Sequence, residues 1–230
     1  MDYKYGYLFL GTFLFLIWIL FYALRKDLRR KLIKVSLYGG FAGFIAEYWY
    51  FKDYWHPYSI IGRKIVSPED FIFGFTITGI SVVVYDIFFK TKDEAFIANS
   101  KKTFGMMFLI GVASLFVFNI FLGINSIFVS SITFIILTLY MLSKRVDLWK
   151  EAIFSGLIVL LIMFAVYHIL FNLIFLDFWD KCWLLAKTKY GITIYGNIPV
   201  TEMIWYFTWG SFSGLAYNFA SGKKKVKLTE

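Results

Sequence analysis

Ser67-Pro68-Glu69-Asp70-Phe71-Ile72-Phe73 places two carboxylates directly before an apolar run that continues through residue 89. Residues 71–89 form a stretch of 19 residues with one further charge, Asp86. A membrane-spanning helix needs about 20 mostly apolar residues, so this segment is long enough to cross a bilayer. The pattern returns 132 residues later as Pro199-Val200-Thr201-Glu202-Met203-Ile204-Trp205. Two apolar helices are therefore expected to begin beside a carboxylate.

The composition indicates an integral membrane protein. The chain of 230 residues is 60% hydrophobic and 17% charged, whereas soluble domains are about 45–50% apolar and about 25% charged. The net charge of +9 is better explained by basic loops on one side of a membrane than by nucleic-acid binding. A single cysteine, two histidines and the absence of glycine-rich phosphate motifs indicate no disulfide, metal site or nucleotide cofactor.

The apolar segments predict an all-α membrane protein with seven transmembrane helices. Residues 103–143 contain no charge and are long enough for two spans folded back at residues 122–126. The other expected spans are residues 5–24, 35–51, 71–89, 152–176 and 203–220.

The distribution of lysine and arginine predicts the orientation in a cell membrane. Of 24 basic residues, 17 fall in the loops after spans one, three and five and in the C-terminal tail. Because cytoplasmic loops carry the excess of positive charge, the N-terminus is expected outside and the C-terminus in the cytoplasm.

An internal repeat organises these spans into two parallel units. Residues 66–86 align without a gap on residues 198–218, which pairs Asp70 with Glu202 and Asp86 with Asn218. Spans one to three thus correspond to spans five to seven, with span four as the linker helix. The expected organisation is a first three-helix repeat at 1–90, a linker with the fourth helix at 91–126, and a second repeat with a basic tail at 127–230.

The acidic residues have a structural and a functional interpretation. Ser67, Pro68 and Asp70 suit a helix N-terminus, where serine caps, proline fits the first turn and Asp70 completes a capping box. Alternatively, Asp70 and Glu202 meet near the axis between the repeats, where paired carboxyls hold a proton for acid catalysis. Glu47, within the second span, is a functional candidate or an interfacial hydrogen-bonding group.

The order of these motifs resembles the small membrane-integral lycopene cyclases, in the form that fuses two three-span units. In that family an acid ends the second span, a loop with Trp and Gly follows, and Pro-x-Glu-Glu-x-x-Phe opens the third. Glu47, Trp55, Gly62 and residues 66–73 follow this order, and residues 198–205 match in the second unit. Ser67, Asp70 and Thr201 depart from the motif, since the family has Pro, Glu and Glu there.

The resemblance implies non-redox cyclisation of a polyene end group, as in a lycopene β-cyclase, without a cofactor. The expected substrate is a hydrophobic polyene or isoprenoid from the bilayer, and membrane lipids are the other expected partners. The catalytic candidates are the four acids Glu47, Glu69, Asp70 and Glu202. The substrate-binding candidates are Trp55, Phe73, Thr201, Trp205 and Asn172, the last as the rough counterpart of Glu47.

Two alternatives remain open. A small-solute transporter can also have parallel three-plus-one-plus-three repeats, although the three prolines lie in loops or at helix starts and not within spans. A non-catalytic relative of the cyclases, with a lipid-binding or scaffolding role, is the second. Ring type and oligomeric state are not encoded in these motifs.

Overall fold

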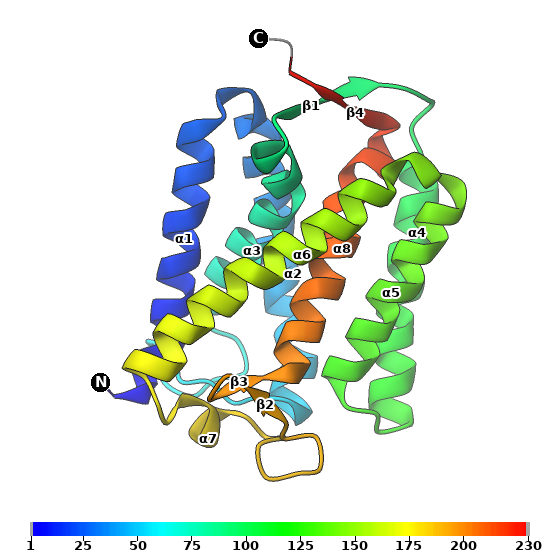
Figure 1. Ribbon diagram of the computed structural model, residues 1–230. Coiled ribbons are helices and arrows are strands. Elements are labelled where there is room, and N and C mark those ends of the chain that lie inside the picture. Colours follow the sequence, from blue (N-terminus) through cyan, green and yellow to red (C-terminus); the bar gives the residue numbers. More distant parts are fainter. Residues whose placement is uncertain (1, 229–230) are drawn as a thin grey trace.

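The computed structural model describes residues 2–228, and seven long helices form a bundle (Figure 1). The α-helices, with the π-helical ends of α4 and α6, are α1 (Gly6–Leu24), α2 (Arg29–Asp53), α3 (Pro68–Phe88), α4 (Lys101–Leu115, extended by Phe116–Phe121), α5 (Ser126–Lys144), α6 (Trp149–Tyr167, extended by His168–Ile174), the short α7 (Phe178–Cys182) and α8 (Val200–Ser221). Four short strands complete the fold: β1 (Thr91–Ala95), β2 (Thr193–Ile194), β3 (Ile198–Pro199) and β4 (Lys223–Lys227). The prediction of an all-helical core is confirmed, whereas the strands were not expected.

Among the described residues, five helices have the length and apolar composition needed to cross a membrane: α1, α3, α4, α5 and α6. The helices α2 and α8 lie among them but do not meet the same criterion. Basic residues at its start and Glu47 near its end make α2 less apolar than the others. Most of α8 is buried in the bundle, and its glycines, serines and aromatic residues suit contact with other helices.

The helices α3 and α8 lie at the centre of the bundle. α3 packs against α1, α2, α6 and α8, while α8 packs against α3, α4, α5 and α6. The helix α4 is peripheral and contacts α5 and α8. Because α3 and α8 both begin at the same end of the bundle (Figure 1), the two acidic motifs lie at that same end.

Glycines allow the closest helix contacts. A side chain at Gly39 or Gly43 of α2 would collide with backbone atoms of α3, and one at Gly74 of α3 would collide with the Gly39 carbonyl. On the other side of the bundle, Gly156 of α6 and Gly210 of α8 pack in the same manner. Small residues spaced four apart permit such backbone approach, which drives helix association in lipid.

The turns α1–α2 and α5–α6 have the same construction. Arg25 binds Asp27 through Nε and Nη2 at 2.8 and 2.7 Å, and its Nη2 also donates to the Thr91 carbonyl at 2.7 Å. Arg145 binds Asp147 at 2.7 and 2.6 Å, and its Nη2 donates to the carbonyl of Lys223 at 2.8 Å. Both arginines therefore tie a helical turn to the first residue of a strand.

These two strands pair with each other across the bundle. β1 and β4 are antiparallel, with Asp93 opposite Lys225 at the centre of the register. Asp93 and Lys225 also belong to a buried charge cluster with Lys31 of α2 and Asp86 of α3. Both lysines bind both aspartates at 2.6–3.0 Å. The charges compensate one another, as buried charges must. This end of the molecule, with both arginine turns, is called the basic end below.

At the opposite end, the two long loops are joined to each other. Trp55 pairs with Trp183 as a β-bridge. The His56 amide donates to the Cys182 carbonyl at 2.7 Å, and the Leu184 amide donates to the Tyr54 carbonyl at 2.9 Å. The loop after α2 and the loop after α7 thus form a cap over the starts of α3 and α8.

Gly74→Ala tests the close contact of α2 and α3. The added methyl group would meet the Gly39 carbonyl, and overpacking of this kind costs about 1–3 kcal/mol. Gly105→Ala in α4 is the matched control, because nothing lies within contact of a methyl group there. Thermal unfolding in detergent should show a lower Tm for Gly74→Ala only; equal Tm values would contradict the contact.

Asp93→Asn tests the buried charge cluster. Burial opposes ionisation of Asp93, but the ammonium groups of Lys31 and Lys225 hold its pKa well below the usual range. Its contribution to stability is present above the ordinary aspartate pKa of about 3.9 and is lost as the pH falls towards the folded value. Removing one partner of a buried pair costs about 3–5 kcal/mol.

Glu94→Gln, at an exposed position on the same strand, is the control and should change stability by less than about 0.5 kcal/mol. Unfolding of both variants in detergent, measured from neutral to acidic pH, compares them. If Asp93→Asn unfolds like Glu94→Gln at neutral pH, the cluster does not stabilise the fold.

Candidate active site

Buried carboxyl groups gather at the end of the bundle opposite the basic end. Four acids lie there, and each is at most 6% exposed: Glu47, Glu69, Asp70 and Glu202. Glu47 comes from the last turns of α2, Glu69 and Asp70 from the first turn of α3, and Glu202 from the first turn of α8. Acidic groups suit the positive end of a helix dipole, which favours these positions at the starts of α3 and α8.

Asp70 is held by its own helix cap and by a tyrosine. Its Oδ2 accepts hydrogen bonds from the Ser67 amide at 2.5 Å and from the Ser67 hydroxyl at 2.9 Å. The predicted capping box is therefore present. Its other oxygen, Oδ1, accepts a hydrogen bond from the Tyr7 hydroxyl of α1 at 2.7 Å. Both oxygens of Asp70 thus have donors.

Glu47 lies beside Asp70 but has fewer partners. One turn before it on α2, Gly43 packs against the Asp70 carbonyl. Glu47 interacts electrostatically with Asp70, with Trp55 and, less strongly, with Glu202. Oε1 of Glu47 is buried without a hydrogen-bond partner among the described residues. Glu47 and Asp70 therefore form a close pair in which only Asp70 is fully hydrogen-bonded.

Glu202 is held by tyrosine hydroxyls on both oxygens. Tyr54 donates to Oε1 at 2.6 Å, and Tyr167 of α6 donates to Oε2 at 2.7 Å. The hydroxyl of Tyr206 lies 2.7 Å from that of Tyr167, and Thr201 lies 3.0 Å from the hydroxyl of Tyr54. A chain of hydroxyl groups therefore leads to each oxygen of Glu202.

Aromatic rings fill the space between the two acidic groups. Phe73 contacts Tyr7, the partner of Asp70, with ring centroids 6.3 Å apart, and contacts Tyr206 at 6.5 Å. Trp55 packs edge-on against Tyr7 at 4.8 Å. Trp205 contacts Phe73, and its indole donates to the Tyr50 hydroxyl at 2.7 Å. Trp55, Phe73, Thr201 and Trp205 are thus brought together with the acids.

Asp70 and Glu202 have different partners in the structure. Within residues 2–228, no hydrogen bond joins the two carboxyls, and each has its own set of donors. Phe73 of α3 and Tyr206 of α8 contact each other at the interface between those helices, with ring centroids 6.5 Å apart. Glu47 interacts electrostatically with Asp70, and one turn before Glu47 the helix α2 contacts the Asp70 backbone at Gly43.

Two of the sequence candidates, Glu69 and Asn172, hold loops by hydrogen bonds. Glu69 accepts a hydrogen bond from the Ile60 amide at 2.6 Å and so anchors the loop before α3. Asn172, in the π-helical end of α6, donates to the Tyr195 carbonyl at 2.6 Å and accepts from the Asn197 amide at 2.9 Å. Asn172 therefore holds the β2–β3 loop.

The tyrosines at the acids were missed by the sequence analysis: Tyr7, Tyr54, Tyr167 and Tyr206. One signal could have found Tyr167, because it follows Arg145 by the same number of residues as Glu47 follows Arg25. A tyrosine in the second unit therefore stands where the first unit has an acid. Asn172, the rough counterpart expected from the sequence, lies past that position.

No group of three or more His, Cys, Asp or Glu in residues 2–228 is arranged to hold a metal ion. Beside the start of α3, the surface is hollowed by an open apolar groove of about 470 Å³, lined by Phe44, Val66, Ser67, Pro68, Phe71 and Ile72. The arrangement thus combines buried carboxyls, tyrosine donors and aromatic faces with a neighbouring apolar surface.

Comparisons with known proteins gave one match. Neither the curated proteins nor the solved structures included a match to this chain. The family model described as "Lycopene cyclase" matches residues 125–220. That range covers α5, α6 and α8, with Tyr167, Glu202 and Tyr206 at the site. The match supports the assignment of this chain to the lycopene cyclase family.

Proposed function

We propose that the protein is a membrane-bound carotenoid or isoprenoid cyclase that closes a ring at the end of a polyene, as a lycopene β-cyclase does. An acid adds a proton to the terminal double bond and produces a tertiary carbocation. A neighbouring double bond attacks this cation, which forms the ring and moves the positive charge onto it. A base then removes a proton from the ring. One proton is added and one is removed, so the reaction needs no oxidant or reductant.

One observation supports this proposal most directly: two separate carboxyl sites, at Glu47–Asp70 and at Glu202, are joined by a layer of aromatic rings. An acid-initiated cyclisation needs both a proton donor and a proton acceptor. Aromatic faces stabilise a nearby cation. Phe73 and Trp205 are the rings placed between the two sites.

The hydrogen bonds favour different roles for the acids. Asp70 and Glu202 accept donors on both oxygens, which suits carboxylates. Two adjacent carboxylates cannot both ionise cheaply, so Glu47, with its unpartnered oxygen, is the group in the pair that keeps a proton. We assign proton donation to Glu47 beside Asp70 and proton removal to Glu202. Glu69 then has a positioning role, because its hydrogen bond from the Ile60 amide holds the loop before α3.

The proposal includes the arrangement in the membrane. Two parallel three-helix units, α1–α3 and α5–α6–α8, surround the site, with α4 as the linker. The matching contacts of Arg25 and Arg145 support this repeat. The basic end faces the cytoplasm, because cytoplasmic segments carry the excess of lysine and arginine. The N-terminus and the acids then lie at the outer side of a cell membrane, and the polyene reaches them from the lipid.

Expression in a lycopene-producing bacterium tests the reaction. The expected result is conversion of lycopene to a cyclic carotene of unchanged mass, detected by chromatography and mass spectrometry, because the reaction adds and removes one proton. Cells that carry the empty vector are the control. Unchanged lycopene beside well-inserted protein contradicts cyclase activity on this substrate and favours a transporter or a non-catalytic relative.

Glu47→Gln and Glu202→Gln test the roles of the acids. Each change removes a proton-transfer group with little change in shape, so each should lower the cyclisation rate by about 10²-fold or more. Glu151→Gln is the matched control, since Glu151 is a buried glutamate near the basic end, bonded by Asn218 at 2.9 Å. Rates are compared per amount of inserted protein. Full activity of either site variant would contradict the assigned role.

A further inference from the structure

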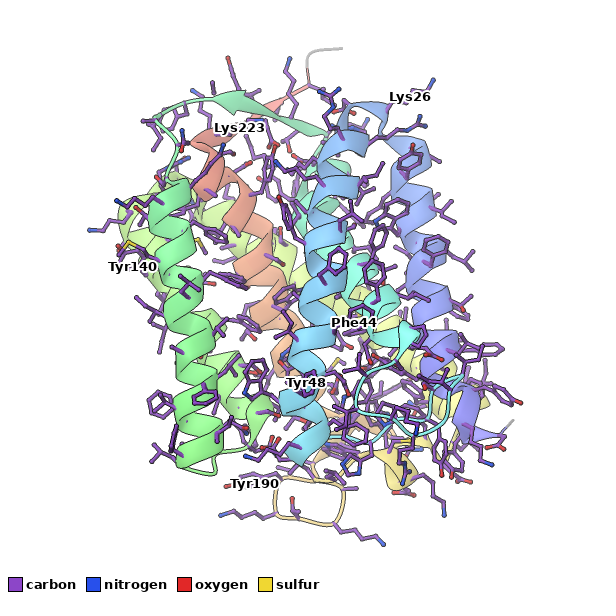
Figure 2. The ribbon with its side chains drawn as sticks, turned by 180° about the vertical axis from the view of Figure 1, so that it is seen from behind. Lys26, Phe44, Tyr48, Tyr140, Tyr190 and Lys223 are labelled. Atoms are coloured by element: carbon purple, nitrogen blue, oxygen red, sulfur yellow. The ribbon has the colours of Figure 1, made fainter. Side chains whose placement is uncertain are left out.

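The apolar groove beside α3 shares one lining residue, Ser67, with the hydrogen bonds of the buried acid Asp70. Phe44 lies on α2 beside the start of α3 (Figure 2), and its ring contacts that of Phe71 at 5.5 Å. Neighbouring residues on the same face of α2 are strongly exposed, with Phe41 at 61% and Ile45 at 58%. In a membrane, this face meets lipid. The groove is therefore open to the hydrocarbon phase.

Ser67 connects the groove to the site. It lines the groove, and both its amide and its hydroxyl donate to Asp70 at 2.5 and 2.9 Å. Ser67 and Asp70 are 4% and 3% exposed. One residue therefore separates the apolar groove from the buried acid.

At the corresponding place in the second unit, a ring from a loop of the protein packs on the helix. Phe164 follows Arg145 by the same number of residues as Phe44 follows Arg25. The ring of Tyr195, from the β2–β3 loop, packs against Phe164 at 5.7 Å and against His168 at 5.1 Å. Asn172 holds this loop by its bond to the Tyr195 carbonyl. Phe164 thus packs against a ring from the β2–β3 loop, whereas Phe44 packs against Phe71 of α3 and lines the groove.

We propose that the groove between α2 and the start of α3 binds the flat, unsaturated end of the hydrocarbon substrate and leads it to Asp70 past Ser67. The inference rests on the proposed function and adds the side from which the substrate reaches the site. The substrate takes the place beside Phe44 that Tyr195 takes beside Phe164.

Val66→Trp tests the groove by filling it with a side chain. In membranes that contain the protein, the lycopene concentration for half-maximal cyclisation should rise at least about tenfold, since contacts in the groove are lost. Leu161→Trp is the control, because Leu161 is an exposed residue on α6, 62% exposed and away from the groove. It should leave this concentration unchanged. Equal values for both variants would overturn the inference.

Photocrosslinking tests binding without requiring turnover. Benzoylphenylalanine is placed at Phe44 or at Leu161 in the full chain, lycopene is added to the membranes, and adducts are identified by mass spectrometry. The expected result is a lycopene adduct at position 44 that exceeds the adduct at 161 by about tenfold and is lost when Val66→Trp is added. Phospholipid acyl adducts alone at position 44 would overturn the inference.

The two tests separate the groove from the reaction. If the wild-type protein binds lycopene at position 44 but does not cyclise it, the proposed function fails and the groove is supported. If the protein cyclises lycopene while positions 44 and 161 crosslink equally, the function stands and the groove is overturned.

Discussion

The close packing of α2 on α3 is the contact on which the site depends. Gly39, Gly43 and Gly74 bring the two backbones together, because a side chain at any of them would collide with the other helix. This contact sets Glu47, one turn past Gly43, beside Asp70. In lipid, where apolar surface gives helices no reason to associate, such close packing and interhelical hydrogen bonds hold them together. The acidic pair follows from this packing.

The buried charged groups at the two ends of the bundle have different kinds of partner. At the basic end, Lys31 and Lys225 compensate Asp86 and Asp93, and the result is a structural cluster. At the opposite end, the acids have no basic partner in the contacts described; tyrosine hydroxyls, a serine and backbone amides bind them. Unlike ion pairs, carboxyl groups bound by hydroxyl groups can gain and lose a proton without leaving a buried cation unpaired. This difference makes the second end the candidate for chemistry.

Much of the site could be predicted because it depends on spacing along the chain. Asp70 and Glu202 begin two helices at equal places, and Ser67 with Asp70 forms the expected cap. The tyrosines could not be predicted in this way. Tyr7, Tyr54 and Tyr167 come from three segments that are far apart in the sequence, and a tyrosine in a membrane helix commonly lies in the interfacial belt.

The helical class, the positions of the long helices, the placement of the two acidic motifs at helix starts and the excess of positive charge at one end could all be read from the sequence. These features depend on local hydropathy, capping and composition, which act within a few residues. The tertiary structure was needed to show that α2 brings Glu47 to Asp70, that β1 pairs with β4, and that the ring of Tyr195 packs against Phe164. These contacts depend on how closely helices approach and on which loop reaches which helix, and neither is encoded in the spacing of residues along one segment.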